Sequence, residues 1–149
     1  MKFLYEEKNT KKTIEYEFNK NWIESSITIK AINFAKAFGD FISPDNQKDK
    51  NYITTSQFRT VYGELKRIQM KKFKDNKTSF LLLKPKMAYL LKRNVNKNNK
   101  DAYNKFHDFF NQMYDLVLEG GENEEIKRFN NMMEILEATL AYHKSFGGK

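Results

Sequence analysis

Positively charged side chains are concentrated in the middle of this 149-residue chain. Between Arg59 and Lys105 there are 14 Lys or Arg and three Asp or Glu, a local charge of +11, whereas the whole chain carries +8. Lysine is also abundant in proteins of AT-rich genomes, so arginine is the better indicator, and three of the four arginines lie in this block. The block and a pI near 9.5 favour a polyanionic partner.

Helical spacing groups the strongest of these charges on common faces. In a predicted helix over residues 54–73, apolar positions recur every three or four residues and basic positions fall away from them. In the next predicted helix, two basic residues lie seven positions apart on one stripe. Guanidinium groups suit phosphate oxygens, and ammonium groups bind them as point charges. The candidate contacts to a nucleic-acid backbone are Arg59, Lys66, Arg67, Lys86 and Arg93. For each residue, the alternative is an ordinary solvated surface charge.

Tyr89 and Gly63 lie among these candidates. Tyr89 falls between Lys86 and Arg93 on the same stripe, where its ring would suit a base stacked beside a phosphate chain. The alternative is a tyrosine packed in the core. Gly63 has an arginine four residues away on each side and costs about 1 kcal/mol relative to alanine inside a helix. Either its backbone is cleared for the close approach of a ligand, or another helix packs closely there.

Residue types that carry catalysis are sparse or badly spaced. There is no cysteine and no Gly-rich phosphate loop, and His107 and His143 fall on different predicted helices without an acid at ligand spacing. Asp101, Asp108 and Asp115 recur every seven residues and could line a metal site, but a solvated helix face is the favoured interpretation. The sequence therefore predicts no catalytic centre, no metal site and no cofactor. It favours a binding and assembly module over an enzyme.

Periodic apolar residues predict an all-α protein, a compact bundle of about five helices. Thr54 and Gln57 form a capping-box pattern at the clearest helix start. Gly39 suits a helix end. The Lys84–Pro85 step predicts a helix boundary, because proline disfavours helical geometry in the residue before it. The helices are predicted near residues 26–38, 54–73, 85–94, 100–119 and 124–146.

Residues 1–21 are predicted as an N-terminal extension and residues 22–149 as a single helical-bundle domain. In the extension, Ile14, Tyr16 and Phe18 alternate with glutamates, which is a strand pattern. No partner strand is evident, so we expect an irregular segment or a short docking helix. No apolar run is long enough to cross a membrane, and the charged N-terminus lacks a signal core. We therefore expect a cytoplasmic location without membrane contact.

Three segments carry a family resemblance through their order and spacing. They are TTSQFRTVYGELKRI (Thr54–Ile68), FLLLKPKMAYLLKR (Phe80–Arg93) and AYHKSFGGK (Ala141–Lys149). Together they resemble the small subunit of type III-A CRISPR effector complexes, the Csm complexes. The similarity extends from about Ala31 to the end of the chain, and residues 1–21 depart from the family.

The resemblance implies a compact helical protein without catalytic activity, stacked in several copies along a filament. Its partners would be CRISPR RNA, target RNA, copies of itself and the other effector subunits, which hold the guide and carry the cleavage and signalling activities. Arg59, Lys86 and Arg93 fall within the matched segments and would contact the RNA backbone. Lys92 stands where the family pattern leads us to expect a small residue.

Two other functions fit the same residues. The chain could be a helical protein–protein scaffold without a direct nucleic-acid role, with a charge that reflects composition alone. It could also be a free-standing DNA-binding helical protein, which would need a short helix-turn-helix with a recognition helix. The long polar loops predicted between the helices disfavour this second alternative.

Overall fold

A computed structural model describes residues 1–44 and 50–147. In these residues the chain forms β1 (Lys2–Glu6), β2 (Thr13–Glu17), α1 (Asn21–Glu24), α2 (Ile29–Phe41), α3 (Thr55–Met70), the 3-10 turn η1 (Phe73–Asn76), α4 (Lys77–Asn94), α5 (Lys100–Glu119) and α6 (Glu125–Ser145). The predicted helical fold is confirmed, with α5 at its predicted bounds and α6 within one residue of them. The sequence also predicts a polar connecting loop over residues 43–51, and residues 45–49 of it lie outside the described residues.

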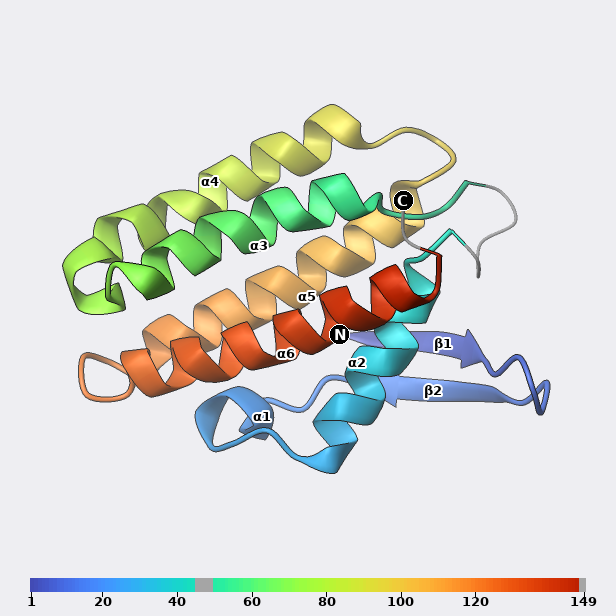
Figure 1. The fold of residues 1–149 in the computed structure, drawn as a ribbon, viewed down its shortest axis with the longest axis horizontal. Coiled ribbons are helices and arrows are strands. Elements are labelled where there is room, and N and C mark those ends of the chain that lie inside the picture. Colours follow the sequence, from blue (N-terminus) through green and yellow to red (C-terminus); the bar gives the residue numbers. More distant parts are fainter. Residues whose placement is uncertain (45–49, 148–149) are drawn as a thin grey trace.

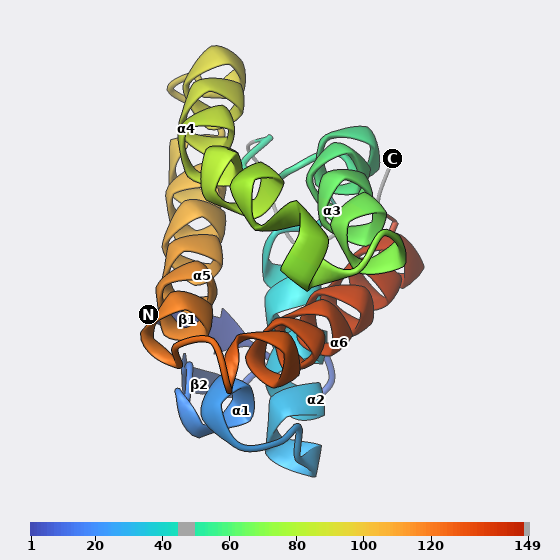
Figure 2. The ribbon, with the colours of Figure 1, turned by 90° about the vertical axis from the view of Figure 1, so that its left-hand side faces the viewer.

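Four long helices, α3 to α6, run along the long axis of the molecule, and α2 crosses them steeply (Figure 1). The end-on view shows α3 and α6 on one side, and α4 and α5 on the other (Figure 2). Helix α2 makes its most extensive contact with α6. Buried side chains from the hairpin and from all of these helices form one continuous hydrophobic core.

The start of α3 is built as the sequence predicts. Thr54 Oγ1 accepts a hydrogen bond from Gln57 N, and Gln57 Oε1 accepts one from Thr54 N, both at 3.2 Å. This confirms the capping box. Gln57 also accepts a hydrogen bond from the Tyr103 hydroxyl of α5. Ile53 is fully buried, and its carbonyl oxygen lies 2.6 Å from His143 Nε2 of α6. The first turn of α3 is therefore tied to two other helices.

His143 should make the stability of the fold depend on pH. The ring is fully buried, and Nε2 carries its proton because the Ile53 carbonyl oxygen can only accept. Burial lowers the pKa of His143 below its ordinary value near 6.5. The folded state therefore takes up a proton here less readily than the unfolded state. The free energy of unfolding should be level above about pH 6.5 and should fall below it.

Urea unfolding between pH 5 and pH 7.5 checks this prediction. The free energy of unfolding of the wild-type protein should decrease as the pH falls from 7.5 to 5. The His143→Gln variant should show a weaker pH dependence. His107→Gln is the control, because His107 is a half-buried histidine of α5. The same pH dependence in the wild-type protein and in His143→Gln would contradict the assignment.

The prediction that Gly39 ends a helix is wrong. Helix α2 begins after its cap, Thr28, and continues for two residues beyond the glycine. A Cβ atom at Gly39 would lie 2.9 Å from both His143 N and Thr139 O of α6. The missing side chain lets the backbones of α2 and α6 approach each other. Gly39 therefore serves helix packing instead of helix termination.

The long helix predicted over residues 54–73 ends early. Helix α3 stops at Met70, Lys72 has a φ of 70°, and Phe73 begins the η1 turn. Phe73 is still buried, with its ring against Phe80 and Phe129. The apolar periodicity of residues 54–73 also predicts Phe73 as a core residue, and the turn, instead of a helix, places it there. The same turn reverses the chain, so that α4 returns beside α3 (Figure 1).

The predicted helix boundary at Lys84–Pro85 is also wrong, because α4 begins at Lys77 and carries Pro85 in its interior. A proline inside a helix leaves the carbonyl oxygen four residues earlier without its helical donor. Here that oxygen belongs to Leu81, and it accepts a hydrogen bond from the Tyr114 hydroxyl of α5 at 3.0 Å. A neighbouring helix thus satisfies the group that proline frees.

The N-terminal residues form a β-hairpin, so the expectation of an irregular segment or a docking helix is wrong. Strands β1 and β2 pair antiparallel, with Phe3 opposite Tyr16. Phe3 is buried, and its ring centroid lies 5.5 Å from that of Phe34 and 5.2 Å from that of Phe38 in α2. The hairpin thus contributes to the same core as the helices. The division into an extension and a domain at residue 21 stays a prediction.

Asp40 of α2 anchors this hairpin. The residue is fully buried, and its carboxylate accepts hydrogen bonds from the Tyr5 hydroxyl and from Ser43 Oγ, the latter at 3.3 Å. Lys8 Nζ lies 3.5 Å from the same carboxylate. Burial, followed by the bond to Asp40, raises the pKa of Tyr5, so the hydroxyl stays a donor. A buried carboxylate with several partners holds the hairpin against α2.

Candidate nucleic-acid interface

Helices α3 and α4 lie against each other as the two arms of a helical hairpin joined by η1 (Figure 1). Each helix buries one apolar face in the core and exposes the opposite face. The buried positions are Phe58, Val61, Leu65 and Ile68 in α3, and Phe80, Leu83, Met87 and Leu91 in α4. The basic positions between them therefore reach the solvent.

All five predicted contact residues have exposed side chains. They are Arg59, Lys66 and Arg67 on α3, and Lys86 and Arg93 on α4. Within residues 1–44 and 50–147, no hydrogen bond or ion pair engages Arg59, Lys86 or Arg93. The charge of these three side chains is free for a ligand.

Lys66 and Arg67 have partners within their own helix. Lys66 Nζ lies 3.0 Å from Gln69 Oε1, and Arg67 Nη1 lies 3.5 Å from Glu64 Oε2. The Lys66 contact is an exposed hydrogen bond, and the Arg67 side chain is 65% exposed in its pair with the half-buried Glu64. Such largely exposed contacts contribute only about 0–1 kcal/mol, because water and salt screen them. A phosphate group can therefore exchange with either partner at little cost.

Other lysines of the basic block serve the fold. Lys77 Nζ lies 2.8 Å from Glu125 Oε1 at the start of α6, and Lys84 Nζ lies 3.2 Å from Asp115 Oδ1 of α5. These partners come from distant parts of the chain, so sequence spacing could not show them. The pair with Lys84 also accounts for one member of the aspartate stripe on α5. The partly free positive charge is therefore narrower than the basic block. Among the described residues it covers the outer faces of α3 and α4, and it continues onto exposed lysines of the turn and loop at their ends, Lys71, Lys72, Lys74 and Lys97.

The structure excludes one of the two alternatives for Tyr89 and for Gly63. The Tyr89 side chain is 66% exposed, so packing in the core is excluded. Gly63 is exposed, and a Cβ atom there would meet no atom within 4 Å. No helix in the described part of the chain explains this glycine. A clear backbone surface on α3 remains, with an arginine on each side of it.

Replacing Gly63 with alanine separates stability from ligand access. Alanine is the better helix former and nothing obstructs its methyl group, so the free energy of unfolding should rise by about 0.5–1 kcal/mol. If this surface receives RNA, as the family resemblance implies, RNA affinity should fall, because the methyl group covers the clear surface. Urea unfolding and fluorescence anisotropy measure the two effects. The control is Ala141→Gly at an exposed position of α6. It should lower the free energy of unfolding without changing RNA affinity. Unchanged RNA binding by Gly63→Ala would contradict a role in ligand approach.

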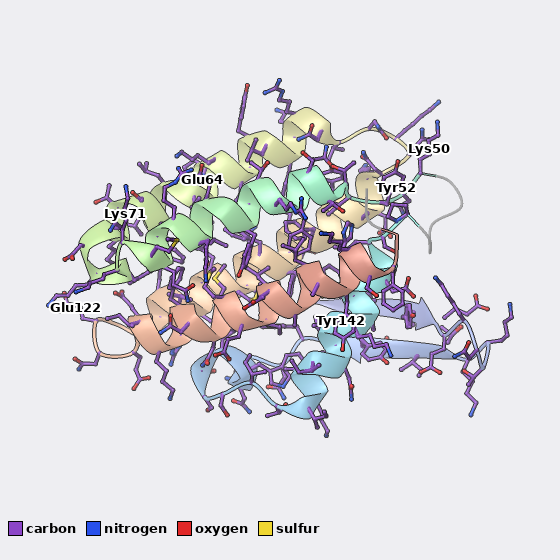
Figure 3. The ribbon with its side chains drawn as sticks, viewed as in Figure 1. Lys50, Tyr52, Glu64, Lys71, Glu122 and Tyr142 are labelled. Carbon is purple, nitrogen blue, oxygen red and sulfur yellow. The ribbon has the colours of Figure 1, made fainter. Side chains whose placement is uncertain are left out.

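A cleft of about 260 Å³ lies between α3 and α4 near the middle of both helices. Its floor is apolar and buried or half-buried, and consists of Val61, Leu83, Met87 and Leu90. Its rim consists of Thr60, Glu64, Lys86 and Tyr89, and Glu64 is labelled on α3 in Figure 3. Thr60 and Glu64 were not among the predicted site residues, because only the position of α4 beside α3 brings them into this cleft.

The described residues offer neither a metal-binding cluster nor a membrane-spanning helix. No group of three or more His, Cys, Asp or Glu is placed there to hold a metal ion. In the same ranges, every helix is too short or too polar for a bilayer span.

The fold and its exposed face define a small, mostly helical protein with an N-terminal β-hairpin and a basic helical surface. A family model described as Csm2 Type III-A matches residues 26–149. The chain belongs to this family and is a structural small subunit of a type III-A CRISPR effector complex, where it assembles with other subunits. The resemblance carried by the three segments is thereby confirmed. No curated protein and no solved structure matches the chain. The β-hairpin lies outside the matched residues.

Proposed function

We propose that the chain is a non-catalytic subunit that binds CRISPR RNA and target RNA through the exposed face of α3 and α4. One observation carries this proposal: Arg59, Lys86 and Arg93 are exposed on neighbouring helices and have no partner among the described residues. Lys66 and Arg67 add two charges whose local partners are easily exchanged. Five cationic groups on one helical hairpin suit the phosphates of an RNA backbone.

A guide–target RNA duplex is a suitable ligand for such a face. Proteins recognise A-form duplexes mostly by shape and by contacts to the phosphates and 2′-hydroxyls. Contacts to phosphates position a protein without reading sequence. In RNA-guided complexes, base pairing with the guide supplies the sequence specificity. A subunit that uses phosphate contacts could therefore serve any guide.

Several copies stacked along the duplex would compensate for weak individual affinity. Binding modules that are tethered in one assembly raise each other's effective concentration. The proposed partners are therefore CRISPR RNA, target RNA, neighbouring copies of the chain and the other effector subunits, in the cytoplasm. Catalysis is assigned to those other subunits, in keeping with the family resemblance.

The isolated protein should bind single-stranded RNA weakly, without strong sequence preference, and with a steep dependence on salt. Each phosphate contact contributes about −0.7 to the slope of log affinity against log salt concentration for single strands. Five contacts would give a slope of about −3.5, and three a slope of about −2. Fluorescence anisotropy with labelled RNA over a range of KCl concentrations measures this slope. A flat salt dependence, or strong preference for one RNA sequence, would contradict the proposal.

The same titration, repeated with labelled duplex DNA, separates the two alternative functions. A protein–protein scaffold without a nucleic-acid role would not bind RNA even at low salt. A free-standing DNA-binding protein would prefer duplex DNA with a defined site over RNA of any sequence.

A further inference from the structure

We infer that the cleft between α3 and α4 accommodates one unpaired nucleobase of the bound RNA, with Tyr89 as its stacking surface. This inference rests on the proposed RNA-binding function and deepens it. The proposed phosphate contacts do not use this cleft. Its floor is apolar, whereas the face around it is basic.

The size and lining of the cleft suit a small planar group. Pockets for drug-sized ligands occupy roughly 300–1,000 Å³, and this cleft has about 260 Å³. A single base fits that space better than a whole nucleotide with its sugar and phosphate. The floor is formed by aliphatic and thioether side chains, among them Leu83 and Met87. Such a floor contacts the faces of a base without requiring hydrogen bonds.

Charge directs a base into the cleft and phosphates to its outside. The Glu64 side chain is only 33% exposed and lines the cleft, so a phosphate entering it would face a partly desolvated carboxylate. A neutral base meets no such repulsion, and its N–H groups can donate to Glu64. Thr60 donates its hydroxyl hydrogen to Ser56 O at 3.0 Å, which leaves the Thr60 oxygen as an acceptor. Phosphates flanking the base would then contact Lys86 and Arg93.

Tyr89 supplies the aromatic surface at the rim. It is the one exposed aromatic side chain in the described part of the chain, and no hydrogen bond there engages its hydroxyl. Lys86 precedes it by one helical turn and Arg93 follows it by one turn. Stacking of a base on such a ring tolerates any sequence, because every base has a π-face. The inference therefore agrees with RNA binding that lacks strong sequence preference.

The test compares two proteins with two RNAs. The proteins are the full-length wild type and Tyr89→Ala. The RNAs are a short single strand with all its bases and the same ribose–phosphate chain made from stable abasic residues. Affinities are measured by anisotropy at low salt. Tyr89→Ala should weaken binding of the base-bearing RNA about five- to tenfold, the lower part of the range for base–aromatic stacking, and should leave binding of the abasic chain unchanged.

Two further variants and one spectroscopic signal make the comparison specific. Tyr89→Phe keeps the ring and should restore base-dependent binding. Ile126→Ala removes a 48% exposed apolar side chain of α6 and should have no effect. A 2-aminopurine base within the RNA should lose fluorescence on binding the wild type or Tyr89→Phe, because stacking quenches it, and should keep its fluorescence with Tyr89→Ala.

The outcomes distinguish this inference from the proposed function. Equal affinity losses for both RNAs, or no loss for either, would overturn the base-binding cleft while salt-dependent binding of the abasic chain still supported the backbone contacts. Failure of the wild type to bind either RNA at low salt would overturn both proposals. Tyr89→Ala could also impair assembly of the complex and leave RNA affinity unchanged. That result would assign the cleft to a protein partner and overturn the inference.

Discussion

The Arg59→Ala, Arg67→Ala and Arg93→Ala triple variant should lose about 100-fold in RNA affinity at 0.1 M salt. Three phosphate contacts, each contributing about 0.7 to the salt slope, amount to about two decades of affinity between 1 M and 0.1 M salt. The slope itself should become shallower by about 2. Melting should barely move, because each exposed substitution changes the free energy of unfolding by about 0.5 kcal/mol or less. Anisotropy with the protein, and target-RNA binding by the reconstituted complex, measure the loss.

A matched triple variant on other faces controls for net charge. This control removes an equal number of positive charges, three, from exposed positions near α1 and on α6. Its substitutions are Lys20→Ala, Lys127→Ala and Lys144→Ala. This variant should keep most of the affinity, because general attraction by net charge is weak at that salt concentration. Equal losses in the two triple variants would assign RNA binding to net charge. Early melting of the arginine variant would make these residues structural.

Replacing Phe3 with alanine should lower the free energy of unfolding by about 3–5 kcal/mol, the range for large aromatic truncations in a core. Phe3 is 3% exposed, and its ring contacts Tyr16 of the paired strand and both Phe34 and Phe38 of α2. Domains of this kind have about 5–15 kcal/mol of stability in total. The hairpin would then be an integral part of the domain instead of an extension. Urea unfolding monitored by circular dichroism measures the change.

Leu4→Ala is the control for this prediction. Leu4 is the next residue of β1, but its side chain points to the opposite face of the strand and is 62% exposed. Its truncation should change stability by about 0.5 kcal/mol or less. A similarly small effect of Phe3→Ala would show that the hairpin is only loosely attached and would support the predicted boundary at residue 21.

Local signals in the sequence predicted the helices well where a pattern within one segment decides the structure. The Thr54–Gln57 capping box begins α3, and the apolar periodicity of α5 and α6 gives their bounds within one residue. The same periodicity placed the five candidate contacts away from the core, and all five are exposed. These features depend on neighbours three or four positions away, which a sequence displays directly.

The errors arose where a distant residue decides the structure. Pro85 stays inside α4 because Tyr114 of another helix satisfies the Leu81 carbonyl oxygen. Gly39 stays inside α2 because α6 lies against it. The hairpin was missed because β1 and β2 are only five residues each and the register is visible only once Phe3 packs on α2. In each case tertiary structure overrode a local preference.

The candidate site was predictable only in part, because local spacing shows which residues are exposed but not which distant residues they contact. Charge and helical spacing identified the exposed basic residues. They could not distinguish Lys86, which is free, from Lys84, which pairs with Asp115 on α5. The cleft that Glu64 lines depends on the way α4 returns beside α3, which no spacing rule reports.

The most direct test of the central claim is ultraviolet cross-linking of the assembled effector complex, purified with its CRISPR RNA and bound to target RNA, followed by mass spectrometry. If the exposed face of α3 and α4 contacts the RNA backbone, nucleotide-linked peptides of this chain should come from Thr55–Met70 and Lys77–Asn94. RNA-linked peptides from the other subunits, with none from these two helices, would contradict the claim.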